Sequence, residues 1–155
     1  MTRSLARRWA VCFLYACYLR EEPPQALFDE WLAPEFYERL REEDELFAKP
    51  PGTAEQSYLR QVAFGVYEEQ ARLDAYIQEH AVDWALNRIP RVALAILRVC
   101  LYEILHVEDV PVSVAINEAV EIAKLYEPQE VCAFINGVLG GFVRAPAPAT
   151  GDPES

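Results

Sequence analysis

The chain has 155 residues, of which 52% are hydrophobic and 25% are charged, a size and composition typical of one globular domain. Its 14 basic and 25 acidic residues give a net charge of -11, which argues against a protein that coats nucleic acid or an anionic membrane non-specifically. The four cysteines form no Cys-x-x-Cys pair. We therefore expect reduced thiols rather than disulfides or a metal centre.

The first predicted element is an amphipathic helix near the N-terminus. Its apolar stretch, residues 9–19, follows three arginines, Arg3, Arg7 and Arg8. The stretch is shorter than the ~20 apolar residues of a membrane span and lacks a small-x-small cleavage site. We interpret it as the first helix of a cytoplasmic protein rather than as a secretory signal.

The two sides of this first helix differ in character. One broad side is apolar, as a core side should be: Leu5, Trp9, Cys12, Phe13, Ala16 and Leu19. The other side begins with the arginines and continues into Val11, Leu14, Tyr15 and Tyr18. Either other helices surround this second side or an external partner docks on it.

Prolines divide the rest of the chain into segments with helical periodicity, at residues 23–24, 34, 50–51, 90, 111 and 128. Proline favours helix starts and interrupts helix interiors. The pattern predicts an all-α fold, a single-domain bundle of about seven helices.

Two of these segments should form the longest and the most buried helices. Residues 53–80 are predicted as one helix, with Thr53 and Gln56 in capping-box spacing and Gly65 as a weak point. Residues 91–105 are apolar nearly all round, interrupted chiefly by Arg98 and Glu103. This helix is expected at the centre of the fold.

The C-terminal part should hold two more helices and a tail. A helix capped by Ser113 is expected after Pro111, although alternating valines leave a strand over residues 110–116 as an alternative. The last helix is expected near residues 129–143, ending at Gly140-Gly141. The domain would span residues 1–144, and residues 145–155, with three prolines and no large apolar residue, are predicted to be disordered.

No sequence motif indicates catalysis. The chain shows no phosphate-binding glycine loop, no nucleophile elbow and no His-Glu-x-x-His pair. Glu103 and His106 could in principle share a metal, but we favour a histidine that closes a helix. The sequence thus predicts no enzymatic activity, no cofactor and no metal.

Two basic islands stand out from the acidic background. Residues 1–20 hold four arginines and no acidic residue, and residues 84–102 hold three arginines and no acidic residue. Arginine bridges phosphates and stacks on bases. The islands could form a local anion-binding face, or they could be solvated surface charge.

Several motifs occur together in the second half of the chain: Arg88-Ile89, Ile96-Leu97-Arg98, Leu101-Tyr102-Glu103, Val110-Pro111, residues 115–124 and residues 134–139. In this order and spacing they resemble the NusB family of transcription antitermination factors. The resemblance runs from the first helix to about Phe142 and departs from the family at Ala93-Leu94, where a charged residue is common.

The resemblance implies a non-enzymatic, all-helical protein that binds the boxA element of nascent ribosomal RNA transcripts together with the ribosomal protein NusE. The pair would assist the RNA polymerase antitermination complex. It also implies RNA contacts from the first helix, at Arg3, Arg7 and Arg8. Tyr15 and Phe134 match aromatic positions of the partner and RNA surfaces, to which we add Tyr18 from the same helix side.

Two other functions remain open from the sequence. NusB-like domains also occur as accessory domains of RNA cytosine methyltransferases, although this chain shows no methyl-donor motif. Alternatively, the chain could be a helical protein-interaction module without RNA binding, a reading favoured by its charge of -11.

Overall fold

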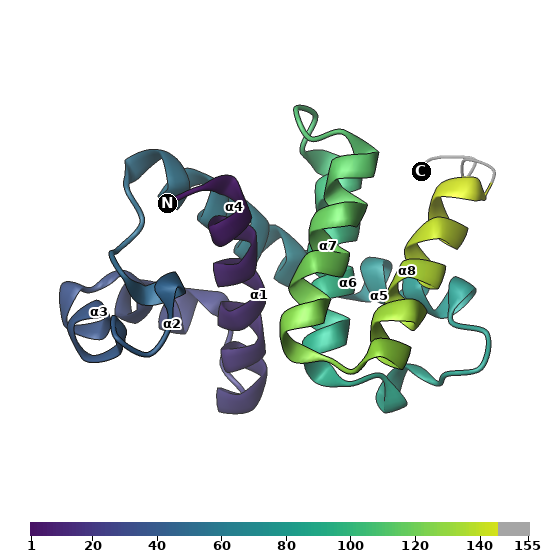
Figure 1. Ribbon diagram of the computed structural model, residues 1–155, viewed down its shortest axis with the longest axis horizontal. Coiled ribbons are helices and arrows are strands. Elements are labelled where there is room, and N and C mark those ends of the chain that lie inside the picture. Colours follow the sequence, from purple (N-terminus) through teal and green to yellow (C-terminus); the bar gives the residue numbers. More distant parts are fainter. Residues whose placement is uncertain (146–155) are drawn as a thin grey trace.

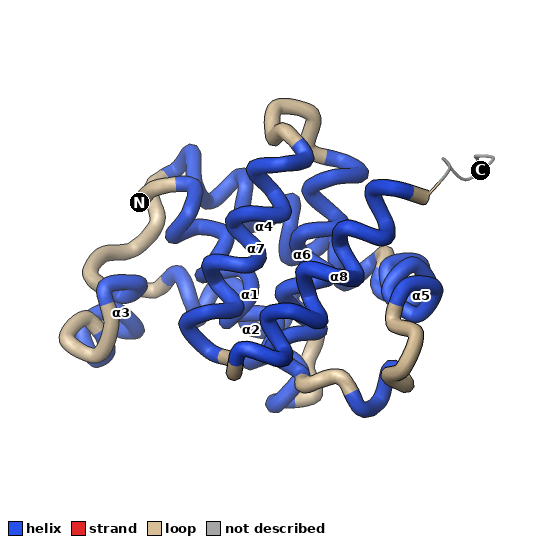
Figure 2. Tube along the Cα trace, turned by 45° about the vertical axis from the view of Figure 1, so that its right-hand side comes forward, coloured by secondary structure: helices blue, strands red, loops and turns tan. Residues whose placement is uncertain are grey.

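The structure, a computed structural model, describes residues 1–145, so most of the tail predicted for residues 145–155 lies outside the described residues. Within the described part all regular structure is helical, which confirms the all-α prediction (Figure 2). Residues 1–145 form eight α-helices, rather than about seven, and two short 3₁₀ helices: α1 (Arg3–Arg20), α2 (Pro24–Leu32), α3 (Pro34–Leu40), η1 (Glu45–Phe47), α4 (Thr53–Glu68), α5 (Gln70–His80), η2 (Leu86–Arg88), α6 (Arg91–His106), α7 (Val112–Tyr126) and α8 (Gln129–Arg144).

Prolines set the beginnings of five helices. Pro24 and Pro34 occupy the first position of α2 and α3, and α6, α7 and α8 each follow directly after a proline. The fixed backbone angle of proline suits a helix start, where no N–H is needed. The alternative of a strand over residues 110–116 is wrong, because α7 already begins at Val112. Pro111 rather than Ser113 is its N-cap residue.

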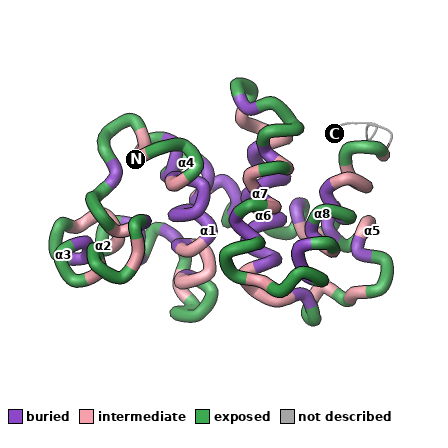
Figure 3. The backbone as a smooth tube through the Cα atoms, in the orientation of Figure 1, coloured by how far each residue is buried: buried purple, intermediate pink, exposed green. Residues whose placement is uncertain are grey.

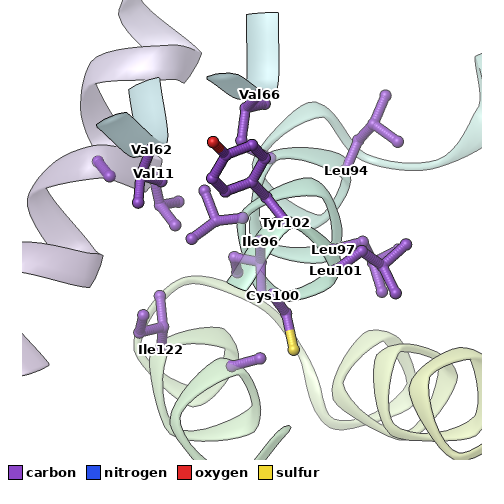
Figure 4. Packing of buried hydrophobic residues seen from close by; sticks show 14 of the residues in the cluster. Val11, Val62, Val66, Leu94, Ile96, Leu97, Cys100, Leu101, Tyr102 and Ile122 are labelled. Atoms are coloured by element: carbon purple, nitrogen blue, oxygen red, sulfur yellow. The ribbon is translucent and has the colours of Figure 1, made fainter. Parts of the chain in front are cut away.

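Helix α6 lies at the centre of the fold, as its apolar sequence predicts. It packs against α1, α4, α5, α7 and α8, and ten of its residues are buried (Figure 3). Val11 of α1, Val66 of α4 and Ile122 of α7 surround its side chains (Figure 4). Because α6 is buried on several of its faces, it is the central helix against which the other helices pack.

Helix α1 lies between two groups of helices. Figure 1 places α2 and α3 on one side of α1 and α7 and α8 on the other. On the first side Trp9 and Phe13 pack edge-on against Phe28 and Trp31 at ring-centroid distances of 5.4–5.8 Å. Trp9 Nε1 also donates a hydrogen bond to Tyr37 Oη at 2.7 Å. One α1 residue assigned to the core side, Leu19, is instead 61% exposed.

The predicted single helix over residues 53–80 is wrong. The helix is interrupted at Glu69, whose backbone angles (φ -101°, ψ 15°) are not helical, and α5 begins at Gln70. Gly65 stays inside α4 because the ring of Tyr102 packs directly against it. The break lets α5 turn to pack against α8.

Two predicted helix ends also differ from the structure. Helix α8 continues through Gly140-Gly141 to Arg144, with the side chains of Arg144 and His80 close to these glycines. The N-cap of α4 is Gly52 rather than Thr53, and only half of a capping box forms: Glu55 accepts a hydrogen bond from the Gly52 amide at 2.9 Å, while glycine has no side chain to accept one in return.

No helix within residues 1–145 is both long enough and apolar enough to cross a membrane.

Candidate nucleic-acid interface

Arg7, expected on an RNA-binding surface, points into the protein. Its Nε donates to Glu103 Oε1 at 2.7 Å and its Nη1 to Glu118 Oε1 at 3.2 Å. Tyr58 Oη donates to the other Glu103 oxygen at 3.0 Å. Burial disfavours the charge of Arg7, but the hydrogen bond and charge of Glu103 outweigh it and raise the pKa of the guanidinium. Arg7 therefore ties α1 to α6 and α7 as part of a buried ion pair.

Arg8 is held in a second network on the same helix. Its Nε donates to Tyr126 Oη at 2.8 Å, and its Nη2 pairs with Asp44. Asp44 in turn caps η1 by accepting from the Leu46 amide at 3.0 Å. Burial alone would raise the pKa of Asp44, but the Leu46 amide and Arg8 outweigh this effect and lower it. Arg8 thus fastens α1 to η1 and to the end of α7.

The expectation that Arg7 and Arg8 lie open on the surface is corrected by these contacts. The two residues are only 5% and 8% exposed. One signal in the sequence pointed to this: Glu103 interrupts the most apolar helix, and a buried acid needs a cationic partner.

Arg3 is the arginine of the predicted cluster that the structure leaves exposed. Its guanidinium carbon lies 4.3 Å from the centroid of the Tyr58 ring. This stacking restricts the side chain while its donors still face solvent. Arg3 is therefore free to contact an external anion.

Tyr15 and Tyr18 lie on a groove of about 560 Å³ at the end of α1. The groove is bounded by the ends of α1 and α4 and the start of α6; its lining includes Leu14, Cys17, Glu21, Glu22, Val66, Tyr67, Gln70, Arg91, Leu94 and Arg98. Tyr18 is 55% exposed, and the Arg91 guanidinium carbon lies 5.7 Å from the centroid of its ring. An aromatic side chain and a cation thus share one edge of the groove.

Phe134 lies elsewhere, on α8, where its ring stacks on Trp84 at a centroid distance of 4.6 Å. It is half-buried and is not among the residues that line the groove. The structure therefore brings Tyr15 and Tyr18 together but separates them from this aromatic pair. Sequence reasoning missed Trp84 and Tyr67, and it included Arg91 only as one of the three arginines of the second basic island.

The histidine and cysteine side chains do not gather into a metal site within residues 1–145. Glu103 is paired with Arg7, and His106 Nε2 instead lies 2.8 Å from Glu69 Oε2. All four cysteines are free thiols. Burial raises the pKa of Cys17 to about 12, which keeps this thiol protonated and unreactive.

Comparisons with known proteins match this chain over nearly all its length. The profile of the NusB family matches residues 4–144. The transcription antitermination protein NusB of Thermoanaerobacter sp. (strain X514) is 38% identical over 144 residues, 93% of this chain and 91% of the relative. The protein of the same name from Thermodesulfovibrio yellowstonii is 39% identical over 142 residues, 90% of this chain and 89% of that one.

Solved structures agree with these matches. NusB of T. maritima superposes with a TM-score of 0.77 and 28% identity, covering 96% of this chain and 94% of that one. A structure of the antitermination factors NusB and NusE in complex with dsRNA superposes with a TM-score of 0.73 over 93% of this chain and 97% of that one. At 22% identity the second match shows the fold alone.

Proposed function

This chain belongs to the NusB family, and we propose that it is a transcription antitermination factor that binds the boxA element of nascent ribosomal RNA transcripts together with NusE. The observation that carries the proposal is the family match, which extends over residues 4–144. A relative of the same fold has been solved with NusE and dsRNA, which supports the same partners here. The function requires a cytoplasmic location, where nascent transcripts are made.

The chain acts by binding rather than by catalysis, and it assembles into the RNA polymerase antitermination complex. Arg3 contacts the RNA backbone directly, because it is exposed and held over Tyr58. Arg7 and Arg8 act as positioning residues, because their ion pairs fix the face of α1 that carries Tyr15 and Tyr18. Phe134 belongs to the partner or RNA surface through the exposed part of its stack with Trp84.

NusE is needed because this chain repels RNA over most of its surface. A net charge of -11 opposes the approach of a phosphate backbone, and only local arginines attract it. A partner that adds its own RNA contacts beside this chain converts two weak interactions into one stronger one. RNA affinity without NusE is therefore modest.

One alternative is favoured by a specific observation. The burial of Arg7 and Arg8 in ion pairs, together with the acidic charge, would suit a helical protein-interaction module that does not bind RNA. Such a module would still bind NusE but would be indifferent to the sequence of the transcript.

A transcription assay tests the proposal. Polymerase, NusE and the other elongation factors of the host are assembled on a template that carries boxA upstream of a terminator, with or without this chain. We expect more read-through when the chain is present and no gain on a template with scrambled boxA. Equal read-through on both templates would contradict RNA recognition and favour the protein-only module.

A further inference from the structure

We propose that Tyr58 of α4 is a positioning residue for RNA binding, which links the exposed Arg3 to the buried carboxylate of Glu103. Its hydroxyl donates to Glu103 and its ring lies under the Arg3 guanidinium. The buried ion pair of the fold thereby sets the place of a cation at the surface. The inference rests on the proposed function, because that function assigns an RNA contact to Arg3.

Arg3 is the arginine of α1 that has no carboxylate partner within residues 1–145. Arg7, Arg8 and Arg20 each form an ion pair with at least one carboxylate, whereas Arg3 pairs with none. The residue is also exposed. Its charge and its hydrogen-bond donors are therefore available to an anion from outside the protein.

The backbone and the side chain of Arg3 are held by separate contacts. Arg3 is the first residue of α1, and the Thr2 hydroxyl caps this helix by accepting a hydrogen bond from the Leu5 amide at 3.1 Å. The guanidinium carbon of Arg3 lies 4.3 Å from the centroid of the Tyr58 ring, against 4.8–5.9 Å for the other arginine–aromatic contacts within residues 1–145. The ring attracts the cation and restricts its rotamers.

The ring of Tyr58 is itself fixed from the interior. Tyr58 is only 6% exposed, and its Oη donates to Glu103 Oε2 at 3.0 Å while Arg7 donates to Oε1 at 2.7 Å. Burial and the charge of Glu103 raise the pKa of Tyr58, so the phenol stays protonated and remains the donor. A tilt of the ring away from Glu103 would leave a buried carboxylate oxygen without its hydrogen bond, which is costly.

The consequence for RNA binding is a pre-ordered cation. A free arginine side chain loses rotamer freedom when it binds a phosphate, and this loss opposes binding. Arg3 lies with its face on the ring, so the donors at the edge of the guanidinium stay open. Because the side chain is ordered before RNA arrives, less freedom is lost at binding. The effect matters in a chain of net charge -11, where few groups attract the RNA.

Two variants of Tyr58 separate the ring from the hydroxyl. Tyr58→Leu and Tyr58→Phe both lose the hydrogen bond to Glu103, but only the Leu variant loses the ring. In anisotropy titrations of fluorescein-labelled boxA RNA at saturating NusE, Tyr58→Leu should bind roughly 2- to 10-fold more weakly, as expected when one arginine side chain has to be ordered at binding. Tyr58→Phe should bind like the wild type.

A tyrosine elsewhere provides the matched control. Tyr76 of α5 also lies under an arginine, with the Arg72 guanidinium carbon 5.7 Å from its ring centroid. Tyr76→Leu should leave RNA binding unchanged. Equal losses of affinity in Tyr58→Leu and Tyr76→Leu would contradict a specific role for Tyr58.

A double-mutant cycle with Arg3 distinguishes positioning from a merely structural role. If Tyr58 acts through Arg3, Tyr58→Leu should cause no further loss of affinity in an Arg3→Ala background. The same fold-loss in both backgrounds would show that Tyr58 acts on the fold as a whole and would overturn the proposal. Thermal unfolding establishes that each variant is folded at the temperature of the titration.

NMR relaxation of the Arg3 Nε–H group tests the ordering without RNA. The signal is assigned by its absence in Arg3→Ala. We expect a restricted Nε–H group in the wild type and in Tyr58→Phe, and a mobile one in Tyr58→Leu. A mobile group in the wild type would overturn the proposal. If the chain binds boxA RNA and Tyr58→Leu binds it equally well, the role of Tyr58 is wrong while the proposed function stands. If the wild type binds no boxA RNA with NusE present, the proposed function fails, and the role of Tyr58 in RNA binding fails with it.

Discussion

Arg7 of α1 and Glu103 of α6, separated by 96 positions in the chain, form a buried ion pair with an Nε to Oε1 distance of 2.7 Å. Both side chains are shielded from solvent, at 6% and 1% exposure. Tyr58 donates to the same carboxylate, so three helices meet at one buried charge. An arginine expected to bind RNA thus holds α1 in place against α6.

Removing either partner should destabilise the fold strongly. Glu103→Ala removes the buried partner of Arg7, leaving it only Glu118, and deprives Tyr58 of its acceptor, so we expect a loss of about 3–5 kcal/mol in the free energy of unfolding. Urea denaturation measures this loss. Glu121→Ala is the control, because its pair with Lys124 is exposed and should contribute less than about 1 kcal/mol. The double variant Arg7→Met, Glu103→Leu should recover most of the stability. Similar losses for Glu103 and Glu121 would contradict a structural role for the buried pair.

The Arg8 and Asp44 pair predicts a pH dependence of stability. The pKa of Asp44 is lowered in the folded state, so its contribution is present above the unfolded pKa of roughly 3.9 and is lost as pH falls through the lower folded value. The stability difference between wild type and Asp44→Asn should therefore be largest near neutral pH and shrink below about pH 4. Chemical denaturation from about pH 7 to pH 3 measures it. A difference that stays constant with pH would argue against the charged pair.

Two glycines should respond oppositely to alanine. At Gly65 a Cβ atom would overlap the side chain of the buried Tyr102, so Gly65→Ala should destabilise the protein by about 1–3 kcal/mol. At Gly137, on the exposed side of α8, a Cβ atom would meet nothing within 4 Å. Gly137→Ala should stabilise it by about 0.5–1 kcal/mol through helix propensity. Thermal unfolding of both variants is the measurement, and a stabilised Gly65→Ala would show that Tyr102 does not pack as described.

The first three arginines of α1 should separate into one that binds RNA, Arg3, and two that position the helix, Arg7 and Arg8. Arg3→Ala should weaken boxA binding and make the salt dependence shallower by ~0.7 in log–log slope, since one ionic contact is lost. Arg8→Ala should lower stability, because Asp44 and Tyr126 lose their partner, but should leave the slope unchanged in the folded fraction. A shallower slope for Arg8→Ala and none for Arg3→Ala would reverse these assignments.

Those parts of the fold that depend on local signals could be predicted from the sequence. Prolines mark the starts of α2, α3, α6, α7 and α8, and the apolar residues around α6 predict its central place. The break at Glu69 was not predicted, because the helical pattern of apolar residues continues across it; after the break α5 packs against α8. The end of α8 was also predicted wrongly, because the helix continues past Gly140-Gly141 to Arg144.

The candidate site also combines features that local sequence patterns predict with features that depend on tertiary packing. Arginines and tyrosines on one side of the first helix were visible as a pattern, and Arg3, Tyr15 and Tyr18 are indeed solvent-accessible. The burial of Arg7 and Arg8 in ion pairs could not be predicted, because their acidic partners lie 96 and 36 residues away in the sequence. Ion pairs between distant residues follow from tertiary packing, which no local periodicity encodes.

Binding to boxA RNA with and without NusE tests the central claim most directly. Anisotropy of labelled boxA RNA is followed while this chain is titrated in, first alone and then with NusE at a fixed saturating concentration, with a scrambled RNA as control. We predict weak binding by the chain alone and an affinity at least about tenfold higher with NusE, a coupling free energy of about 1.4 kcal/mol, on boxA only. The same dissociation constant with and without NusE, or equal binding to the scrambled RNA, would contradict the account.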